Sequence, residues 1–96
     1  MSNRSTPRQN EVLAHTVIDD AVVIVDPRDS QLYWLNPVAS RIWELADGTR
    51  TLEAIASRLS EEFEVDSERA LGDAGEMVRA FATNGMLTLE DEEGVG

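Results

Sequence analysis

The first half of the chain carries apolar patterns that are typical of β-strands. Val12 to Ile18 is rich in β-forming residues and ends at Asp19-Asp20, a polar pair suited to a tight turn. Ala21 to Val25 (AVVIV) is a continuous apolar run, as in a strand that is buried on both faces or packed under helices. Gln31 to Leu35 (QLYWL) follows a proline-containing turn over Asp26 to Ser30. These segments predict a three-stranded antiparallel meander.

Two helices are predicted in the middle of the chain, each with its own start signal. Asn36-Pro37 combines a good N-cap residue with proline at the first helical position, and apolar residues then recur at helical spacing until Asp47-Gly48. Thr51 caps the next helix, whose apolar stripe at i, i+3, i+4, i+7 and i+11 runs from Leu52 to Phe63.

A third helix is predicted from Asp66 or Ser67 to about Asn84, with Gly85 as its terminator. Met86 to Leu89 fits a short final strand. Three strands followed by three helices with short connections predict an α+β domain. Its architecture is a three-stranded antiparallel sheet followed by three helices, with winged-helix-like proportions.

The chain has the length of one domain, with polar segments at both ends. Residues 1–10 hold one apolar side chain, Met1, so we expect a disordered lead-in there. Residues 11–89 then form the folded domain, and residues 90–96 (EDEEGVG) an acidic tail. No apolar run approaches the ~20 residues of a membrane span, and the N-terminus lacks the apolar stretch of a signal peptide. We therefore expect a cytoplasmic protein.

Few side chains are suited to catalysis. Cysteine and lysine are absent, which removes thiolate nucleophiles, cysteine metal sites and Schiff-base chemistry. The single histidine, His15, leaves no second imidazole for a two-histidine metal site. We therefore expect no catalytic residue, no metal and no cofactor, in a protein that is not an enzyme on its own.

The charge of the chain narrows the class of partner. Nineteen acidic and eight basic residues give a formal net charge of -11. Such a field repels phosphate backbones and anionic lipid, so nucleic acid and membranes are not expected partners. A neutral or partly basic polypeptide is a better match for this negative charge.

The third predicted strand is an edge strand without the charges or prolines that usually protect an edge. Leu32-Tyr33-Trp34-Leu35 carries four large apolar or aromatic side chains. A period of two puts Leu32 and Trp34 on one face and the other two residues on the opposite face. An extended peptide can pair with such an edge by β-augmentation. The alternative is that Tyr33 and Trp34 complete the core of a small domain.

The third helix has a wider apolar face than packing on a core from one side requires. The face covers an arc of roughly 160°, whereas about 100° suffices for a helix packed from one side. It comprises Ala70, Leu71, Ala74, Gly75, Met77, Val78, Phe81 and Ala82. We expect the excess flank to line a groove beside the edge strand, where the adaptable side chain of Met77 suits a varied partner. Gly72 and Gly75 indicate either close approach by a ligand or tolerated looseness, since each costs about 1 kcal/mol against alanine.

A motif extends from the third strand to the start of the second helix, with the pattern LN-x-x-A followed by I-x-x-L-x-D-G-x-x-T. Its positions here are Leu35, Asn36, Ala39, Ile42, Leu45, Asp47, Gly48 and Thr51. With this motif the chain resembles the PqqD-like family, the recognition elements of ribosomally synthesised and post-translationally modified peptide (RiPP) biosynthesis.

The resemblance implies a non-catalytic peptide chaperone. Such a protein binds the leader segment of a precursor peptide as an added strand and presents it to a separate maturation enzyme, such as a radical enzyme, a leader protease or a cyclase. The implied strand contacts are Leu32, Tyr33 and Trp34. The implied helix contacts fall among Ala70, Asp73, Ala74, Met77, Val78 and Phe81.

Two other functions remain open. The helical trio also fits a winged-helix DNA-binding regulator, although a recognition helix should be basic and the third helix is not. The apolar edge also fits a structural subunit that dimerises or docks another protein, so a homodimer is possible.

Overall fold

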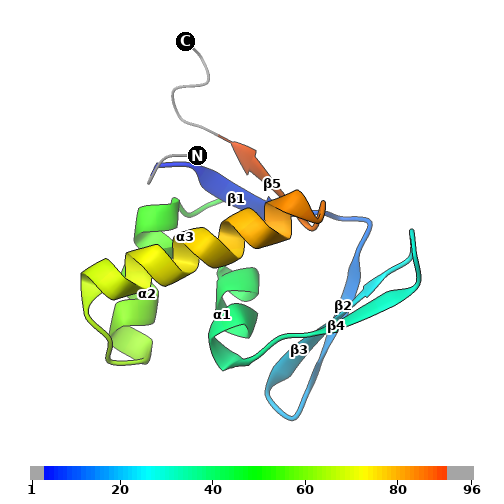
Figure 1. The fold of residues 1–96 in the computed structure, drawn as a ribbon, viewed down its shortest axis with the longest axis horizontal. Coiled ribbons are helices and arrows are strands. Elements are labelled where there is room, and N and C mark those ends of the chain that lie inside the picture. The colour runs from blue at the N-terminus through cyan, green and yellow to red at the C-terminus, as the bar shows by residue number, and fades with distance from the viewer. Residues whose placement is uncertain (1–3, 91–96) are drawn as a thin grey trace.

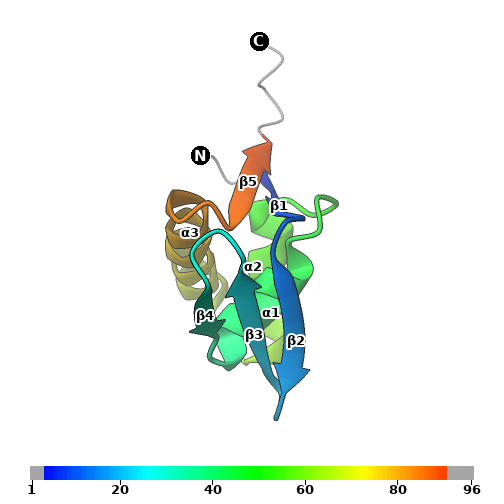
Figure 2. The same cartoon turned by 90° about the vertical axis from the view of Figure 1, so that its right-hand side faces the viewer.

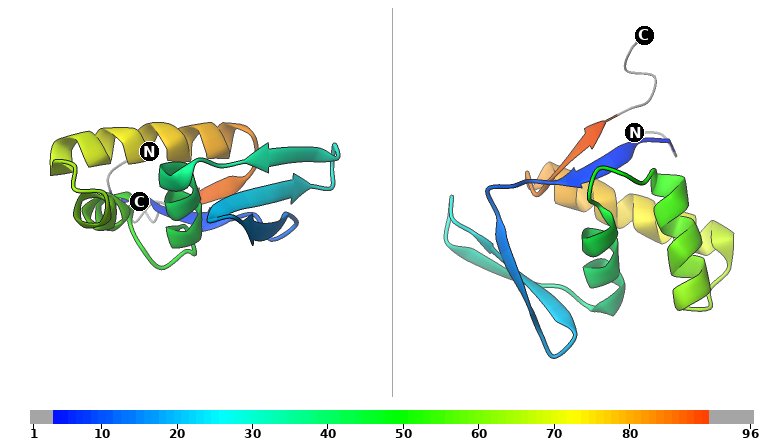
Figure 3. Two further views of the ribbon diagram at one scale, coloured as in Figure 1. Left: turned by 90° about the horizontal axis from the view of Figure 1, so that it is seen from below. Right: turned by 180° about the vertical axis from the view of Figure 1, so that it is seen from behind.

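The computed structural model describes residues 4–90, which form an α+β fold as predicted (Figure 1). Three helices group on one side of the molecule, and a three-stranded antiparallel sheet extends on the other (Figure 3). The elements are β1 (Thr6–Gln9), β2 (Ala14–Ile18), β3 (Ala21–Asp26), β4 (Gln31–Trp34), α1 (Pro37–Leu45), α2 (Leu52–Glu62), α3 (Ser67–Thr83) and β5 (Leu87–Glu90).

The predicted meander is confirmed as the sheet β2-β3-β4. Asp19 and Asp20 form the tight turn between β2 and β3, with φ angles of 51° and 68°. Aspartate tolerates this left-handed region better than most residues, which explains why an Asp-Asp pair suits the turn.

Residues 1–10 were expected to be a disordered lead-in, and this prediction is wrong for their described part. Thr6–Gln9 forms β1, which pairs antiparallel with β5. Backbone bonds also join it to the helices, since Gln9 N donates to Ala46 O at 2.9 Å and Leu52 N donates to Ser5 O at 2.8 Å. Its side chains contribute through the buried Pro7 and through Gln9 Nε2, which donates to Trp43 O at 2.7 Å, so the strand shows no run of large apolar residues in the sequence. Of the expected acidic tail, Glu90 belongs to β5 and residues 91–96 lie outside the described residues.

All three helices begin at predicted caps. Asn36 Oδ1 accepts from Ala39 N at 2.8 Å, and Thr51 Oγ1 accepts from Ala54 N at 3.1 Å. Of the two cap candidates for α3, the cap is Asp66, whose Oδ1 accepts from Arg69 N at 3.0 Å. These side chains satisfy amide groups that a helix start otherwise leaves without partners.

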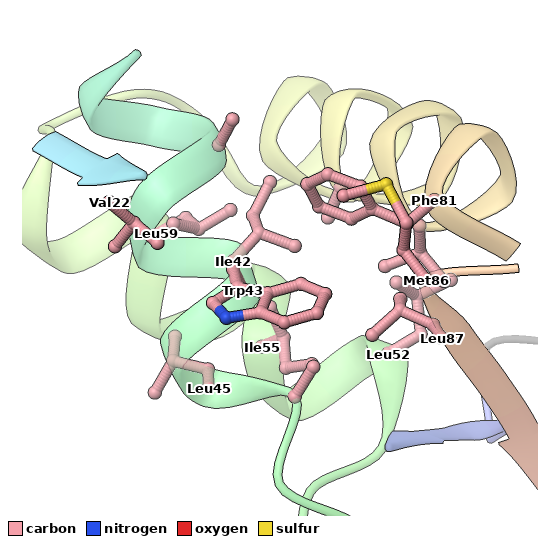
Figure 4. Packing of buried hydrophobic residues seen from close by; sticks show 14 of the residues in the cluster. Val22, Ile42, Trp43, Leu45, Leu52, Ile55, Leu59, Phe81, Met86 and Leu87 are labelled. Atoms are coloured by element: carbon pink, nitrogen blue, oxygen red, sulfur yellow. The ribbon is translucent and has the colours of Figure 1, made fainter. Parts of the chain in front are cut away.

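The core lies between the helices and the inner face of the sheet (Figure 4). Trp43 occupies its centre and meets Phe81 edge-on, with ring centroids 5.6 Å apart. On the surface, Arg41 of α1 forms a two-pronged ion pair with Glu62 of α2, at 2.7 and 2.9 Å. No helix within residues 4–90 has the length and apolar character needed to cross a membrane.

Candidate functional site

The outer edge of β4 is open. Among the described residues, β4 pairs with β3 alone. Leu35 N donates to Val22 O at 2.9 Å, which fixes the phase of the ladder. Because bonded and non-bonded pairs alternate in an antiparallel ladder, the backbone N–H and C=O of Leu32 and Trp34 point away from β3. Two residues therefore offer two donors and two acceptors to a further strand.

The faces of β4 alternate as predicted. Tyr33 and Leu35 pack against the core, whereas Leu32 and Trp34 are 59% and 62% exposed on the outer face. On that face Trp34 stands opposite the buried Val23. The alternative reading, in which Trp34 completes the core, is therefore wrong, although Tyr33 does contribute to it.

Ser40 ends the β3–β4 ladder and ties it to α1. Its hydroxyl donates to Leu35 O and accepts from Val22 N, both at 3.0 Å. The residue is buried. Sequence reasoning missed it, although a serine on the apolar face of a predicted helix was a signal that a backbone partner is needed there.

The other end of β4 is fixed to the end of α3 through the β3–β4 turn. Asp26 is buried and holds Arg28 through two side-chain bonds of 2.9 and 2.7 Å. Arg28 Nη2 also donates to Gly85 O, just beyond α3, at 3.3 Å. The hydrogen bonds from the guanidinium lower the pKa of the Asp26 carboxyl below its usual value, and the same contact raises the pKa of Arg28. The edge strand is thus held at both ends.

A cleft of about 480 Å³ lies between α1 and α3, next to the end of β4. Its apolar lining comes from Val38, Ile42, Met77 and Ala80, and its polar lining from Asn36, Asp73 and Glu76. Figure 2 shows that β4 and α3 lie on the same side of the molecule, with β2 at the opposite edge of the sheet. An open strand edge and a mostly apolar cleft are therefore neighbours.

The predicted helix residues divide into two groups. Asp73 and Met77 line the cleft. The other four are buried in the core, so their side chains are not offered to a ligand in this conformation: Ala70, Ala74, Val78 and Phe81. Sequence reasoning did not identify Glu76 and Ala80 on α3, nor Val38 and Ile42 on α1, as cleft residues. Which flank of α3 is open depends on where α1 packs, and the sequence pattern of α3 does not contain that information.

The described residues contain no cluster of three or more His, Asp or Glu side chains that could hold a metal ion. His15 lies exposed on β2, with its ring edge-on to Trp43 at a centroid distance of 6.3 Å. The chemistry that the β4 edge and the cleft offer is recognition, through backbone pairing and apolar contact.

Comparisons with known proteins agree on the family and the fold. The family model described as "Coenzyme PQQ synthesis protein D (PqqD)" matches residues 21–87. No curated protein matches the chain. The solved structure of TbiB1 in complex with the TbiA(beta) leader peptide has a TM-score of 0.76 at 28% identity, covering 83% of this chain and 93% of that chain.

Two further solved structures share the fold. Lasso peptide synthetase B1 complexed with the leader peptide has a TM-score of 0.77 at 24% identity, covering 86% of this chain and 98% of that one. The PqqD truncation of Methylobacterium extorquens PqqCD, described as a stand-alone RiPP recognition element, has a TM-score of 0.70 at 21% identity. The match covers 85% of this chain and 87% of that chain.

Proposed function

The chain belongs to the PqqD family, and we propose that it is a RiPP recognition element, which binds the leader segment of a precursor peptide as an additional strand on β4. The observation that carries the proposal is the open backbone edge of Leu32 and Trp34 beside the cleft. Two similar structures are complexes with leader peptides, which supports the same class of ligand here.

Strand addition gives the binding energy a physical source. Up to four backbone hydrogen bonds to β4 contribute a net of about 0.5–1.5 kcal/mol each. Leader side chains on the outer face contact Leu32 and Trp34, and those on the inner face enter the cleft beside Met77. Of the residues implied by the family resemblance, we retain Leu32, Tyr33, Trp34, Asp73 and Met77 as contacts.

The protein contributes tethering rather than chemistry. A bound leader raises the effective concentration of the attached core peptide at a separate maturation enzyme, such as a radical enzyme, a protease or a cyclase. This role needs no catalytic group in the chain itself. We place the encounter in the cytoplasm, where ribosomes release the precursor. The DNA-binding alternative has no supporting observation, since the exposed cleft wall of α3 carries Asp73 and Glu76.

The decisive experiment separates the contribution of the β4 backbone to peptide binding from the contribution of its side chains. Peptides are selected from a displayed library of random sequences and titrated into the labelled protein. Amide signals of residues 31–35 and of α3 should shift. Leu32→Pro removes one outward N–H while leaving the bonds to β3 in place, so we expect at least tenfold weaker binding, about 1.4 kcal/mol. Leu32→Ala is the matched control, because it keeps the N–H, and it should bind more tightly than Leu32→Pro.

Two results contradict the proposal: no peptide is enriched, or bound peptides leave the β4 amides unchanged. Circular dichroism verifies that both Leu32 variants are folded. Sedimentation of the free protein and of the complex distinguishes peptide binding from self-association through the same edge.

A further inference from the structure

We infer that the groove selects leader segments with a lysine or arginine side chain facing the cleft between α1 and α3, and that it disfavours an acidic side chain at that position. The inference rests on the proposed function and specifies its substrate class. It follows from the lining of the cleft, the phase of strand addition and the charges along α3.

The lining of the cleft matches a long cationic side chain. Val38, Ile42 and Met77 form an apolar surface, and Asp73 and Glu76 stand on the α3 wall. The two carboxylates are three residues apart, which puts them on neighbouring positions of one helix face. A lysine or arginine lays its methylene stem along apolar surface and keeps its charged end at a polar group. No arginine among residues 4–90 lines the cleft.

Neither carboxylate is neutralised by a strong partner within the described residues. Asp73 faces Arg69 at 3.8 Å, with side chains 53% and 73% exposed, so solvent screens the pair. Glu76 forms no ion pair with another described residue. By contrast, Arg28 and Arg41 are held by short bonds to other carboxylates. The cleft wall therefore carries two negative charges available to a guest.

The phase of strand addition brings a guest side chain to these charges. Successive side chains of the added strand alternate between the outer face, beside Leu32 and Trp34, and the inner face, beside Tyr33. The inner face is the one that adjoins the cleft. An apolar or aromatic residue fits the outer positions, whereas one inner position meets Asp73 and Glu76.

Arg79 is the last charged residue of α3, and it follows Asp73 and Glu76 along the helix. A second, shallower depression shares Glu76 and Ala80 with the cleft and adds Arg79. β4 begins at the turn that contacts the end of α3 and finishes beside the cleft. In an antiparallel ladder, which is slightly more stable per residue than a parallel one, the N-terminal part of the guest lies at the carboxylates. The cation is therefore expected in the N-terminal part of the bound segment.

The test compares peptide selections on three forms of the full chain. They are the wild type, the double variant Asp73→Asn/Glu76→Gln, and the control Glu53→Gln/Glu68→Gln. The control removes the same total charge from a different depression, lined by both glutamates and Leu71. It thereby separates the local effect from the long-range attraction of an acidic protein for cations. Thermal melts verify the fold of each variant.

The expected result has three parts. Peptides enriched on the wild type share a lysine or arginine at a fixed place in an alternating apolar pattern. Changing that residue to glutamate weakens binding to the wild type and to the control about tenfold or more. The same change weakens binding to Asp73→Asn/Glu76→Gln less than about threefold, because attraction and repulsion at this position are both removed.

The outcomes distinguish the two proposals. If no peptide is enriched on any form, strand addition itself is wrong. If peptides are enriched without a basic preference, the inference fails while the proposed function stands. The inference also fails if the basic preference survives in Asp73→Asn/Glu76→Gln, or if the Glu53→Gln/Glu68→Gln control loses it to the same extent.

Discussion

At the scale of single residues, Ser40 is a buried polar side chain at the junction of β3, β4 and α1. One hydroxyl satisfies a buried amide of β3 and the carbonyl at the end of β4, and so joins the sheet to α1.

We predict that Ser40→Ala lowers the free energy of unfolding by about 2 kcal/mol, because it leaves the buried Val22 N–H without a partner. Urea unfolding at neutral pH measures the change. Ser57→Ala, an exposed position on α2, is the matched control and should stay within about 0.5 kcal/mol of the wild type. Equal stability of the two variants would show that the Ser40 hydroxyl is not needed.

Local sequence signals predicted much of the structure at the scale of single residues. Asn36, Thr51 and Asp66 are caps because a short polar side chain precedes an apolar run, and each signal lies within a few residues. The contact between Arg28 and Gly85 is different, since the two residues are 57 positions apart. No local pattern encodes such a contact, so sequence reasoning did not find what fixes the β3–β4 turn.

At the scale of elements, glycine has different roles inside α3 and just beyond its C-terminal end. Gly85 follows the cap of α3 with a φ of +71°, and an added Cβ would lie 3.0 Å from Arg28 Nη1. Gly72 lies within the helix, and an added Cβ there would have no atom within 4 Å apart from its chain neighbours and the backbone of its own helical turns. The two interpretations of Gly72, close approach by a ligand or partner and tolerated looseness, both stay predictions, since open space beside the residue is compatible with either.

We predict opposite effects for two Gly→Ala changes on this helix. Gly72→Ala should raise the free energy of unfolding by about 0.5–1 kcal/mol, because it removes the helix-interior penalty of glycine. Gly85→Ala should lower it by about 1 kcal/mol or more, because alanine is strained at positive φ. Thermal and urea unfolding measure both. A stabilising Gly85→Ala would contradict the role given to the turn after α3.

The sequence predicted the width of the apolar face of α3 and a groove that Met77 would line, but it did not predict which flank of the helix faces the groove. Its centre is buried, as with Ala74 and Val78, and Met77 lies on the flank at the cleft. The width follows from helical periodicity, whereas the choice of flank depends on tertiary packing. β1 was missed for a related reason, because its pairing partner β5 lies about eighty residues away in sequence.

At the scale of the whole molecule, the acidic balance makes stability depend on pH in a defined direction. Three carboxyls have pKa values below their usual range: Asp26 through its bonds from Arg28, Asp47 through the hydroxyl and amide of Thr49, and Glu62 through Arg41. Each binds a proton more weakly in the folded state than in the unfolded state. Their stabilisation is therefore present above pH ~4–5, where these groups are ionised when unfolded, and it is lost as pH falls through the folded pKa.

We predict that the urea midpoint falls between pH 5 and pH 3, in buffers of constant ionic strength. Glu62→Gln should make this fall shallower, because it removes one of the three groups and leaves the buried Asp26 in place. Glu53→Gln is the control, because Glu53 is exposed on α2 and forms no ion pair with another described residue. A midpoint that is flat or rises over this range would contradict the prediction.

The pairing of β1 with β5 has a practical consequence for linking this protein to other molecules. Thr6 stands opposite Glu90, so both described ends leave the fold side by side, remote from β4 (Figure 1). An affinity tag, a surface anchor or a fused enzyme at either terminus is therefore joined to the described fold at a place away from the groove. The two routes of attachment should be interchangeable in binding assays, and a natural fusion through either end leaves the leader's path unobstructed.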